Sequence, residues 1–385
     1  MKKIWSLDTP CYQELVADDL DGDGKKEIVA LGNSFVSENR LIYGKYVQRK
    51  YFLDIYKENL LLSTFQDSKQ NNVLEDEDEY EMRARGLFVA DLDRDRMKEI
   101  IVSTPHQIGF YKYLLNRGEA VSPGRLVMIT AFQPSLPGEM LRVNAVSLIQ
   151  EQGEYKLIVW VNVEIIEKHV FLGQADYIKK VENRGYVLVY GFSKEKKRWL
   201  LSARIPLEIG MMGTLLTADL DDANPAEICI LGQKSATEAK DAVFYVMKKK
   251  SEWSVWTYPA GIQSFVSMRL GAGRLQSIKD ENEIVAVKPG IMQLDIYEWT
   301  EQNGLVSLLS KNLADDKAFS SVLKIIVADI DHDGSNEIIL AGFGRSTPEN
   351  GDLFLGVYNQ KLEPIGRIIG GGLGEKRVQA VAIID

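Results

Sequence analysis

Short apolar runs recur along the whole chain, and turn-forming or charged residues separate them. Leu87–Ala90, Glu99–Val102 and Val187–Tyr190 are examples. Short runs of this kind, rich in β-branched and aromatic residues and bounded by turn signals, are typical of β-strands. The pattern therefore predicts an all-β fold.

The predicted strands fall into units of about fifty residues that repeat one order of four strands. The first strand is almost wholly apolar and leads into an acidic turn, and the second follows that turn at once, as Glu99–Val102 follows Asp91–Asp95. The fourth strand often carries Trp and ends near Pro. The third strand usually ends in tyrosine: Tyr56, Tyr190, Tyr297 and Tyr358. Four-stranded units repeated radially are the blades of a β-propeller, with the apolar first strand expected at the inner channel.

We predict a single propeller domain over residues 1–385, most simply with seven blades, of which six are complete. The approximate blade ranges are 11–66, 86–132, 142–206, 211–259, 264–310, 322–369, and 377–385 together with 1–10. The last of these would be a shared blade that closes the ring. Because the chain stops where another acidic turn is expected, we expect the native polypeptide to continue past Asp385. A six-bladed ring padded by the terminal strands is the alternative.

Four acidic knots occupy the turn between the first and second strands of a unit, and they begin at Asp19, Asp91, Asp219 and Asp329. Three of them carry carboxylates at positions one, three, five and nine. Carboxylates this close repel one another unless a cation lies among them. Alternate side chains of a tight loop can surround a hard divalent ion with oxygens. Each complete knot is therefore a candidate calcium loop.

On this frame, Asp-x-Asp-x-Asp-Gly-x-x-Glu followed by Ile-Val or Ile-Ile resembles the FG-GAP and VCBS repeats of integrin-alpha-type β-propellers. The resemblance covers nearly the whole chain and implies structural Ca²⁺ at two or three sites. It implies side-chain ligands at positions one, three, five and nine and a main-chain carbonyl at position seven. The implied ligands are Asp19, Asp21, Asp23, Lys25 and Glu27; Asp91, Asp93, Asp95, Met97 and Glu99; and Asp329, Asp331, Asp333, Ser335 and Glu337.

Two knots depart from the pattern. Arg96 replaces Gly at position six of the second knot, where a Cβ makes a left-handed turn more costly, so we expect weaker metal binding there. The knot at Asp219 has Ala223 at position five and Pro225 at position seven, which favours a solvated turn with little or no metal. An EF-hand needs its last acidic ligand at position twelve, inside a helix. Here Glu27 and Glu337 stand at position nine and lead into strands, so that motif is excluded.

Composition limits the partners. The net charge of −9 argues against a nucleic-acid backbone, and no apolar stretch reaches the ~18 residues needed to span a bilayer. Removing the twelve carboxylates of the three complete knots would change −9 to +3, so the remaining surface is close to neutral. Cys11 and Cys229 do not form a disulfide framework, and Cys229 lies in an apolar run that predicts a buried thiol. Calcium outside cells is millimolar and would fill these loops, which favours an extracellular or cell-surface location. The free thiols and the lack of a leader favour the cytoplasm instead.

Three long insertions are expected at the end of the blades opposite the acidic knots, over blades one to three. Ser34–Gln48 and Val161–Gly185 would be loops between second and third strands, and Gln66–Arg85 would connect two blades. Long loops on a rigid scaffold commonly carry binding surfaces. The run Glu75–Glu79 lies in the same region, either as a solvated loop or as an attractant for a basic partner.

The sequence thus predicts a non-catalytic, calcium-stabilised propeller, favoured as a monomer, that binds a protein or glycan through this loop-rich face. His106, His169 and His332 are scattered, which argues against a catalytic triad. His332 is expected to face solvent inside its knot, and the tryptophans on strands to pack between blades. The alternatives are a polysaccharide-acting enzyme such as a lyase on a calcium-containing propeller, or an architectural module of a longer surface protein.

Overall fold

A computed structural model of the chain provides the structure. The residues that it describes are 12–40, 45–57, 60–66, 86–105, 107–114, 124–151, 153–171, 174–193, 195–196, 198–210, 213–222, 225–234, 241–263, 269–275, 281–288, 292–313, 319–344 and 353–370. The described residues form strands and turns, and they include no helix long and apolar enough to cross a membrane.

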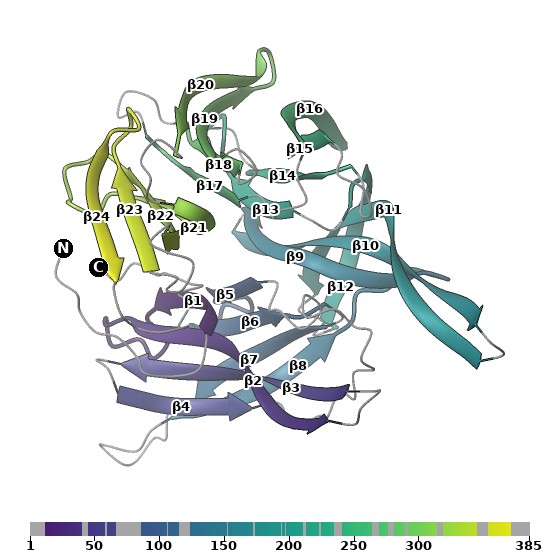
Figure 1. Cartoon of the computed structure of the whole chain (residues 1–385). Coiled ribbons are helices and arrows are strands. Elements are labelled where there is room, and N and C mark those ends of the chain that lie inside the picture. The colour runs from purple at the N-terminus through teal and green to yellow at the C-terminus, as the bar shows by residue number, and fades with distance from the viewer. Residues whose placement is uncertain are drawn as a thin grey trace. The chain divides into compact units, whose positions relative to one another are not determined.

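The strands form four-stranded antiparallel sheets in which the strand order follows the chain (Figure 1). The first sheet contains β1 (Tyr12–Asp18), β2 (Glu27–Arg40), β3 (Lys45–Lys57) and β4 (Leu60–Gln66). The second contains β5 (Gly86–Ala90), β6 (Glu99–Ser103), β7 (Ile108–Leu114) and β8 (Arg125–Phe132). The third contains β9 (Met140–Glu151), β10 (Glu154–Phe171), β11 (Gln174–Ser193) and β12 (Arg198–Glu208).

The next three sheets repeat this order. The fourth contains β13 (Gly213–Ala218), β14 (Glu227–Gln233), β15 (Asp241–Lys249) and β16 (Trp253–Gln263). The fifth contains β17 (Arg269–Gly273), β18 (Glu283–Lys288), β19 (Gln293–Thr300) and β20 (Gly304–Asn312). The sixth contains β21 (Phe319–Ala328), β22 (Glu337–Gly344), β23 (Leu353–Tyr358) and β24 (Pro364–Gly370). The chain is therefore an all-β propeller of four-stranded blades, and this prediction is confirmed. The described residues contain six blades, and the predicted seventh falls on 1–10 and 377–385, outside them.

The chain divides into two compact units. The first comprises residues 1–143, 164–180 and 380–385, and the second comprises 144–163 and 181–379. In the first unit, one apolar core joins the first and second sheets, and it includes Leu31, Ile55, Ile100 and Tyr111. In the second unit, three such cores each join two successive sheets, from the third sheet to the sixth. Packing of successive sheets face to face through their own core is the arrangement of propeller blades.

First strands of successive blades lie close together within each unit: β1 contacts β5, β13 contacts β17, and β17 contacts β21. Gly273 on β17 shows how close the approach is. A Cβ at this position would lie 2.4 Å from Val327 Cγ1 on β21, so only glycine fits without displacing the neighbouring strand.

The residue at position eight of the turn links neighbouring blades. Lys98 forms an ion pair with Asp18 of the preceding blade in the first unit. In the second unit, Asn336 Nδ2 donates a hydrogen bond to the carbonyl of Arg274, 2.8 Å away, and Asn282 donates to the carbonyl of Asp219. The turns between the first and second strands thus stabilise blade-to-blade packing as well as their own blade.

Aromatic side chains also pack between blades, as predicted. Trp256 on β16 and Trp299 on β19 belong to different sheets, and their rings meet edge to face with centroids 5.3 Å apart. Trp299 is fully buried. Cys229 is fully buried as well, and burial raises the pKa of its thiol well above the ordinary value. The interpretation of Cys229 as a buried thiol is confirmed, and Cys11 lies outside the described residues.

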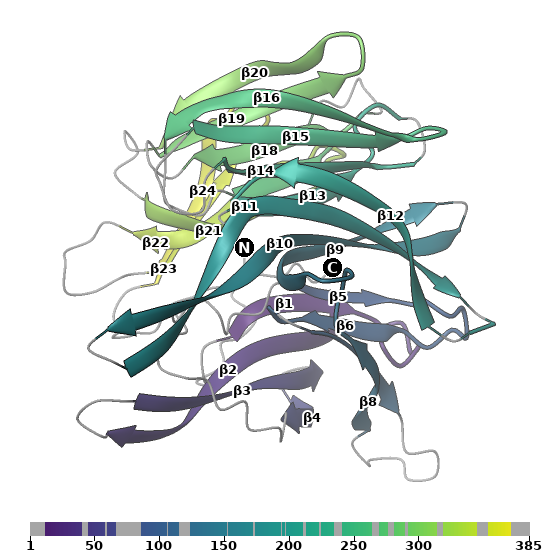
Figure 2. The same ribbon diagram turned by 90° about the vertical axis from the view of Figure 1, so that its right-hand side faces the viewer.

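The structure corrects the interpretation of two insertions as loops. Much of Ser34–Gln48 belongs to the paired strands β2 and β3, whose register continues to the pair Arg40 and Lys45. Val161–Gly185 likewise falls largely on β10 and β11, which run on together as a long hairpin (Figure 2). Frequent Val, Ile, Tyr and Phe give both segments strand propensity, and pairing across the hairpin satisfies their backbone groups. Residues 67–85, including the run Glu75–Glu79, lie outside the described residues.

Candidate metal centre

The acidic knots share one backbone conformation. Position four has a positive φ in all four knots, although glycine occupies it only in the first: Gly22 (79°), Arg94 (62°), Asp222 (55°) and His332 (61°). Position six has φ of 85° at Gly24, 71° at Arg96 and 89° at Gly334. Arg96 therefore adopts the left-handed turn at a steric cost that glycine avoids. His332 is exposed, as predicted for a spacer inside the turn.

Aspartates bind the turn's own amides in the same way in the three complete knots. The amide N–H at position six donates to the first aspartate, at 2.9 Å in the first knot, 3.0 Å in the second and 2.9 Å in the last. The amide at position seven donates to the third aspartate at 2.9, 2.8 and 2.8 Å respectively. One oxygen of each of these carboxylates thus fixes the turn, so the knots are built alike.

The glutamate at position nine has a structural role that does not depend on the aspartates of the turn. Its Oε2 accepts a hydrogen bond from the amide at position two in every knot: Leu20 (2.9 Å), Leu92 (2.8 Å), Leu220 (2.8 Å) and Ile330 (3.0 Å). Glu283 accepts from Leu275 at 2.8 Å in the fifth blade, whose turn has lost the aspartates. The glutamates are buried, so each closes its turn from inside.

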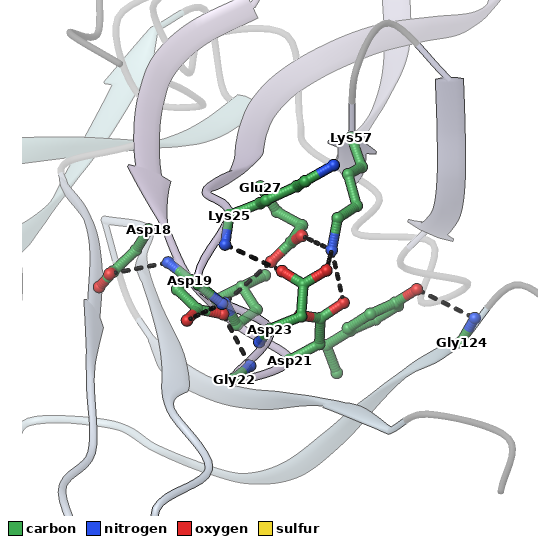
Figure 3. A network of polar contacts seen from close by, with 12 residues as sticks. Asp18, Asp19, Asp21, Gly22, Asp23, Lys25, Glu27, Lys57 and Gly124 are labelled. Atoms are coloured by element: carbon green, nitrogen blue, oxygen red, sulfur yellow. Dashed lines mark hydrogen bonds and ion pairs between the residues drawn. The ribbon is translucent and has the colours of Figure 1, made fainter. Parts of the chain in front are cut away.

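A lysine ammonium lies at the centre of the first knot (Figure 3). Lys57, the last residue of β3, donates to Asp21 Oδ2 and Asp23 Oδ2, each 2.8 Å from its Nζ. The same Nζ lies 2.6 Å from Glu27 Oε1 as an ion pair. An ammonium carries three N–H donors, and here it meets three carboxylates. The cation among the first knot's carboxylates is therefore a side chain of the chain itself.

Lys112 repeats this arrangement in the second knot. Its Nζ lies 3.1 Å from Asp93 Oδ2, 2.6 Å from Asp95 Oδ2 and 2.6 Å from Glu99 Oε1. Lys112 on β7 is the register partner of Glu99 on β6. Antiparallel pairing therefore places the lysine directly opposite the glutamate, 13 positions away in the sequence.

The knot at Asp219 also contains a lysine, although its position-five residue, Ala223, is not acidic and lies outside the described residues. Lys248 forms an ion pair with Asp221 and lies 3.2 Å from Glu227 Oε1. A third carboxylate comes from the turn between β19 and β20 of the next blade, where Glu301 Oε1 lies 3.6 Å away. The lysine again contacts three carboxylates, one of them borrowed from a neighbouring blade.

The last knot differs at the corresponding position. The residue after the position-nine glutamate pairs with a residue on the third strand of its blade. Lys57, Lys248 and Asn359 each come one position after that pairing residue. Asn359 points elsewhere: its Oδ1 accepts from the amides of Lys361 and Glu363, and its Nδ2 donates to Glu363 Oε2 at 2.8 Å. Within the described part of the chain, no lysine, arginine or histidine forms an ion pair with Asp331, Asp333 or Glu337.

The titration behaviour follows these contacts. Burial alone would lower the pKa of Lys57, but its contacts with Asp21, Asp23 and Glu27 raise that pKa above the ordinary value. The hydrogen bond from Lys57 lowers the pKa of Asp23. Burial raises the pKa of Glu337 despite the hydrogen bond from Ile330, and the three aspartates of its knot act in the same direction.

Several acidic clusters are able to hold a metal ion. In each of four groups, three carboxylates bring one oxygen apiece to within 4.8 Å of one another. The groups are Asp19, Asp21 and Glu27; Asp91, Asp93 and Glu99; Asp219, Asp221 and Glu227; and Asp329, Asp331 and Asp333. All-oxygen donor sets suit hard cations such as Ca²⁺ or Mg²⁺. The last knot fits best, because its buried Glu337 and three aspartates receive no cationic side chain from the described residues, and buried charges are normally paired or metal-bound.

In each complete knot, three of the predicted side-chain ligands are thus brought together, while the three lysines were missed at the sequence level. A signal for them existed. Lys57, Lys112 and Lys248 each end or nearly end the third strand of a blade, one residue after an aromatic or apolar side chain: Tyr56, Tyr111 and Met247. The recurring tyrosine at the end of the third strand marks this position, and the positive charge of the residue that follows it is the signal.

No protein-family model matches the chain, and the search of curated proteins found no match. Among solved structures, the chain is similar to the K499G mutant of NanB sialidase from Streptococcus pneumoniae, with a TM-score of 0.38 and 9% sequence identity. The match covers 92% of this chain and 60% of the sialidase chain, so this chain spans less than two thirds of its length. Similarity at this level carries no inference about activity.

Proposed function

We propose that the protein is a non-catalytic β-propeller binding module for a protein or glycan partner, stabilised by calcium in the Asp329–Glu337 knot. The observation that carries the binding proposal is the length of two hairpins. β10 and β11 contain 18 and 20 residues, against 12 and 11 in β9 and β12 of the same sheet. Blades need only short strands to pack, so extension beyond them supports a role outside the core.

The hairpin of β2 and β3 supports the same proposal. These strands contain 14 and 13 residues, whereas β6 and β7 of the next blade contain 5 and 7. In an antiparallel sheet the turn between second and third strands lies at the opposite end from the turn between first and second. The hairpin of β2 and β3 therefore projects from the end of its own blade that is remote from the acidic knot, where a partner would meet it without disturbing the knot.

Calcium in the last knot rests on four carboxylates and a repeated turn. Asp329, Asp331, Asp333 and Glu337 supply oxygens only, and the knots' resemblance to FG-GAP and VCBS repeats favours calcium among hard cations. Ions caged in this way act structurally, since four carboxylates without a neighbouring base or nucleophile offer no open catalytic position.

Shortening the hairpin of β2 and β3 tests the proposed function. The pair Asn33 and Tyr51 would be joined by an Asn-Gly turn, which is suited to two-residue hairpins. The intact and shortened proteins would be compared on a glycan array and for cleavage of acidic polysaccharides. We expect the intact protein to bind without forming products, and the shortened one to lose at least tenfold in affinity while keeping its melting temperature. Unsaturated oligosaccharide products would contradict the proposal in favour of a lyase, and unchanged binding would contradict the role of the hairpin.

A further inference from the structure

Three of the four acidic knots contain a lysine at the place where a metal ion would have to bind. The ammonium of Lys57 is surrounded by Asp21, Asp23 and Glu27, and its side chain is only 18% exposed. A calcium ion needs those same oxygens at about 2.3–2.6 Å. The ammonium and the ion are therefore mutually exclusive occupants of one position.

We infer that Lys57, Lys112 and Lys248 are tethered cations that replace a divalent ion in their knots, so that, of the four acidic knots, only Asp329–Glu337 binds metal. The tether has a thermodynamic consequence. An intramolecular cation is present at an effective concentration fixed by the chain, whereas the stabilisation by a bound ion depends on the logarithm of its free concentration relative to its Kd. The acidic turns of three blades are thus stabilised at any calcium concentration, whereas the stability of the turn at Asp329 depends on calcium.

The knot at Asp219 supports this inference independently, because it is not a complete calcium loop. Lys248 still contacts three carboxylates there, the third being Glu301 in the β19–β20 turn of the next blade. Lys250 holds the same glutamate, with its Nζ 2.6 Å from Glu301 Oε2. The lysine arrangement therefore persists where the metal-ligand pattern is lost, as expected if the lysine, rather than an ion, organises these turns.

The first and last knots form a matched pair for a test. Both have aspartate at positions one, three and five, glycine at position six and glutamate at position nine. They differ at the strand exit, where Lys57 corresponds to Asn359. The inference rests on the proposed calcium site only for the last knot, and the first knot can be tested separately.

The experiment is a reciprocal exchange, Lys57→Asn and Asn359→Lys, with calcium stoichiometry measured by titration calorimetry on chelator-stripped protein. We expect Lys57→Asn to bind one more ion than the wild type and to gain thermal stability on adding calcium. Asn359→Lys should bind one ion fewer. Lys57→Met, which keeps the aliphatic stem without the charge, should reproduce the gain even if asparagine is poorly tolerated.

Asn359→Met is the matched control, because it removes the same turn hydrogen bonds without adding a cation and should keep the wild-type stoichiometry. A folded Lys57→Asn and Lys57→Met pair that bind no additional ion would overturn the inference. Wild-type protein already loaded at the first knot would overturn it too. If the last knot alone failed to bind calcium, the proposed calcium site would be contradicted. The role of Lys57 would still be decided by whether Lys57→Asn binds an additional ion at the first knot.

Discussion

The knots at Asp19 and Asp329 have the same carboxylates and the same turn, but they differ in the cation available to offset the repulsion among those carboxylates. In the first, Lys57 supplies one positive charge against four carboxylates. In the last, Asn359 is committed to hydrogen bonds with Lys361 and Glu363, and no lysine of the described residues lies among the carboxylates. We infer from this comparison that the strand opposite a metal-loop motif decides which cation fills the loop.

The largest expected difference between the two knots concerns the position-nine glutamate. Glu27→Ala removes the acceptor for the Leu20 amide and leaves Lys57 short of one partner. We expect it to lower the free energy of unfolding by about 3–5 kcal/mol, as for breaking a buried ion pair. Glu337→Ala in calcium-free protein should cost only about 1 kcal/mol, because losing the amide's acceptor is offset by less repulsion from the aspartates. Chemical denaturation of both variants in chelator would measure this; equal losses would contradict the distinction.

Calcium removal should act on one knot only. We expect chelation to lower the melting temperature of the wild type, since an ion present at a hundred times its Kd stabilises by about 2.7 kcal/mol. Asp331→Asn with Asp333→Asn should abolish this response. The matched change, Asp21→Asn with Asp23→Asn, should lower stability but preserve the response. Scanning calorimetry with and without calcium distinguishes them, and a response lost in the second variant would refute the assignment.

The smallest effect is a pH dependence at the knot whose lysine fits least closely. Lys248 is 3.2 Å from Glu227, against 2.6 Å for Lys57 and Glu27, and burial raises the pKa of Glu227 to about 7 from an ordinary 4.5. A carboxyl whose pKa is raised in the folded state stabilises it below the unfolded pKa, and that contribution is lost as the pH rises through the folded pKa.

We therefore expect stability to fall by on the order of 1–2 kcal/mol between pH 4.5 and 7 on account of this group. Glu227→Gln should remove that part of the pH dependence, which thermal melts of the two proteins across this range would measure. Parallel pH profiles for wild type and variant would show that Glu227 does not titrate in this window.

The sequence allowed the propeller to be predicted because its signals are local. An apolar strand before each knot, a strand beginning at the glutamate, and a third strand ending in Tyr56 or Tyr358 each depend on neighbours in the chain. Repetition then supplied the architecture. The carboxylates of each knot were found for the same reason, since all lie within nine positions of one another.

What could not be predicted depends on strand register. Lys57 meets Glu27 across 30 positions only because β2 and β3 pair Ile28 with Tyr56, and a one-residue slip would turn Lys57 to the other face. The two long hairpins were mistaken for loops because flexible and paired segments look alike when the polar and apolar residues do not alternate regularly. Pairing across the hairpin accounts for their strand structure.

A crystal of the full chain grown in calcium, with anomalous diffraction recorded near the long-wavelength limit, tests the central claim most directly. Of the four acidic knots, we predict an anomalous peak only within Asp329–Glu337, with the ammoniums of Lys57, Lys112 and Lys248 still among their carboxylates. A calcium peak in the knot at Asp19 or at Asp91, with its lysine displaced, would contradict the account.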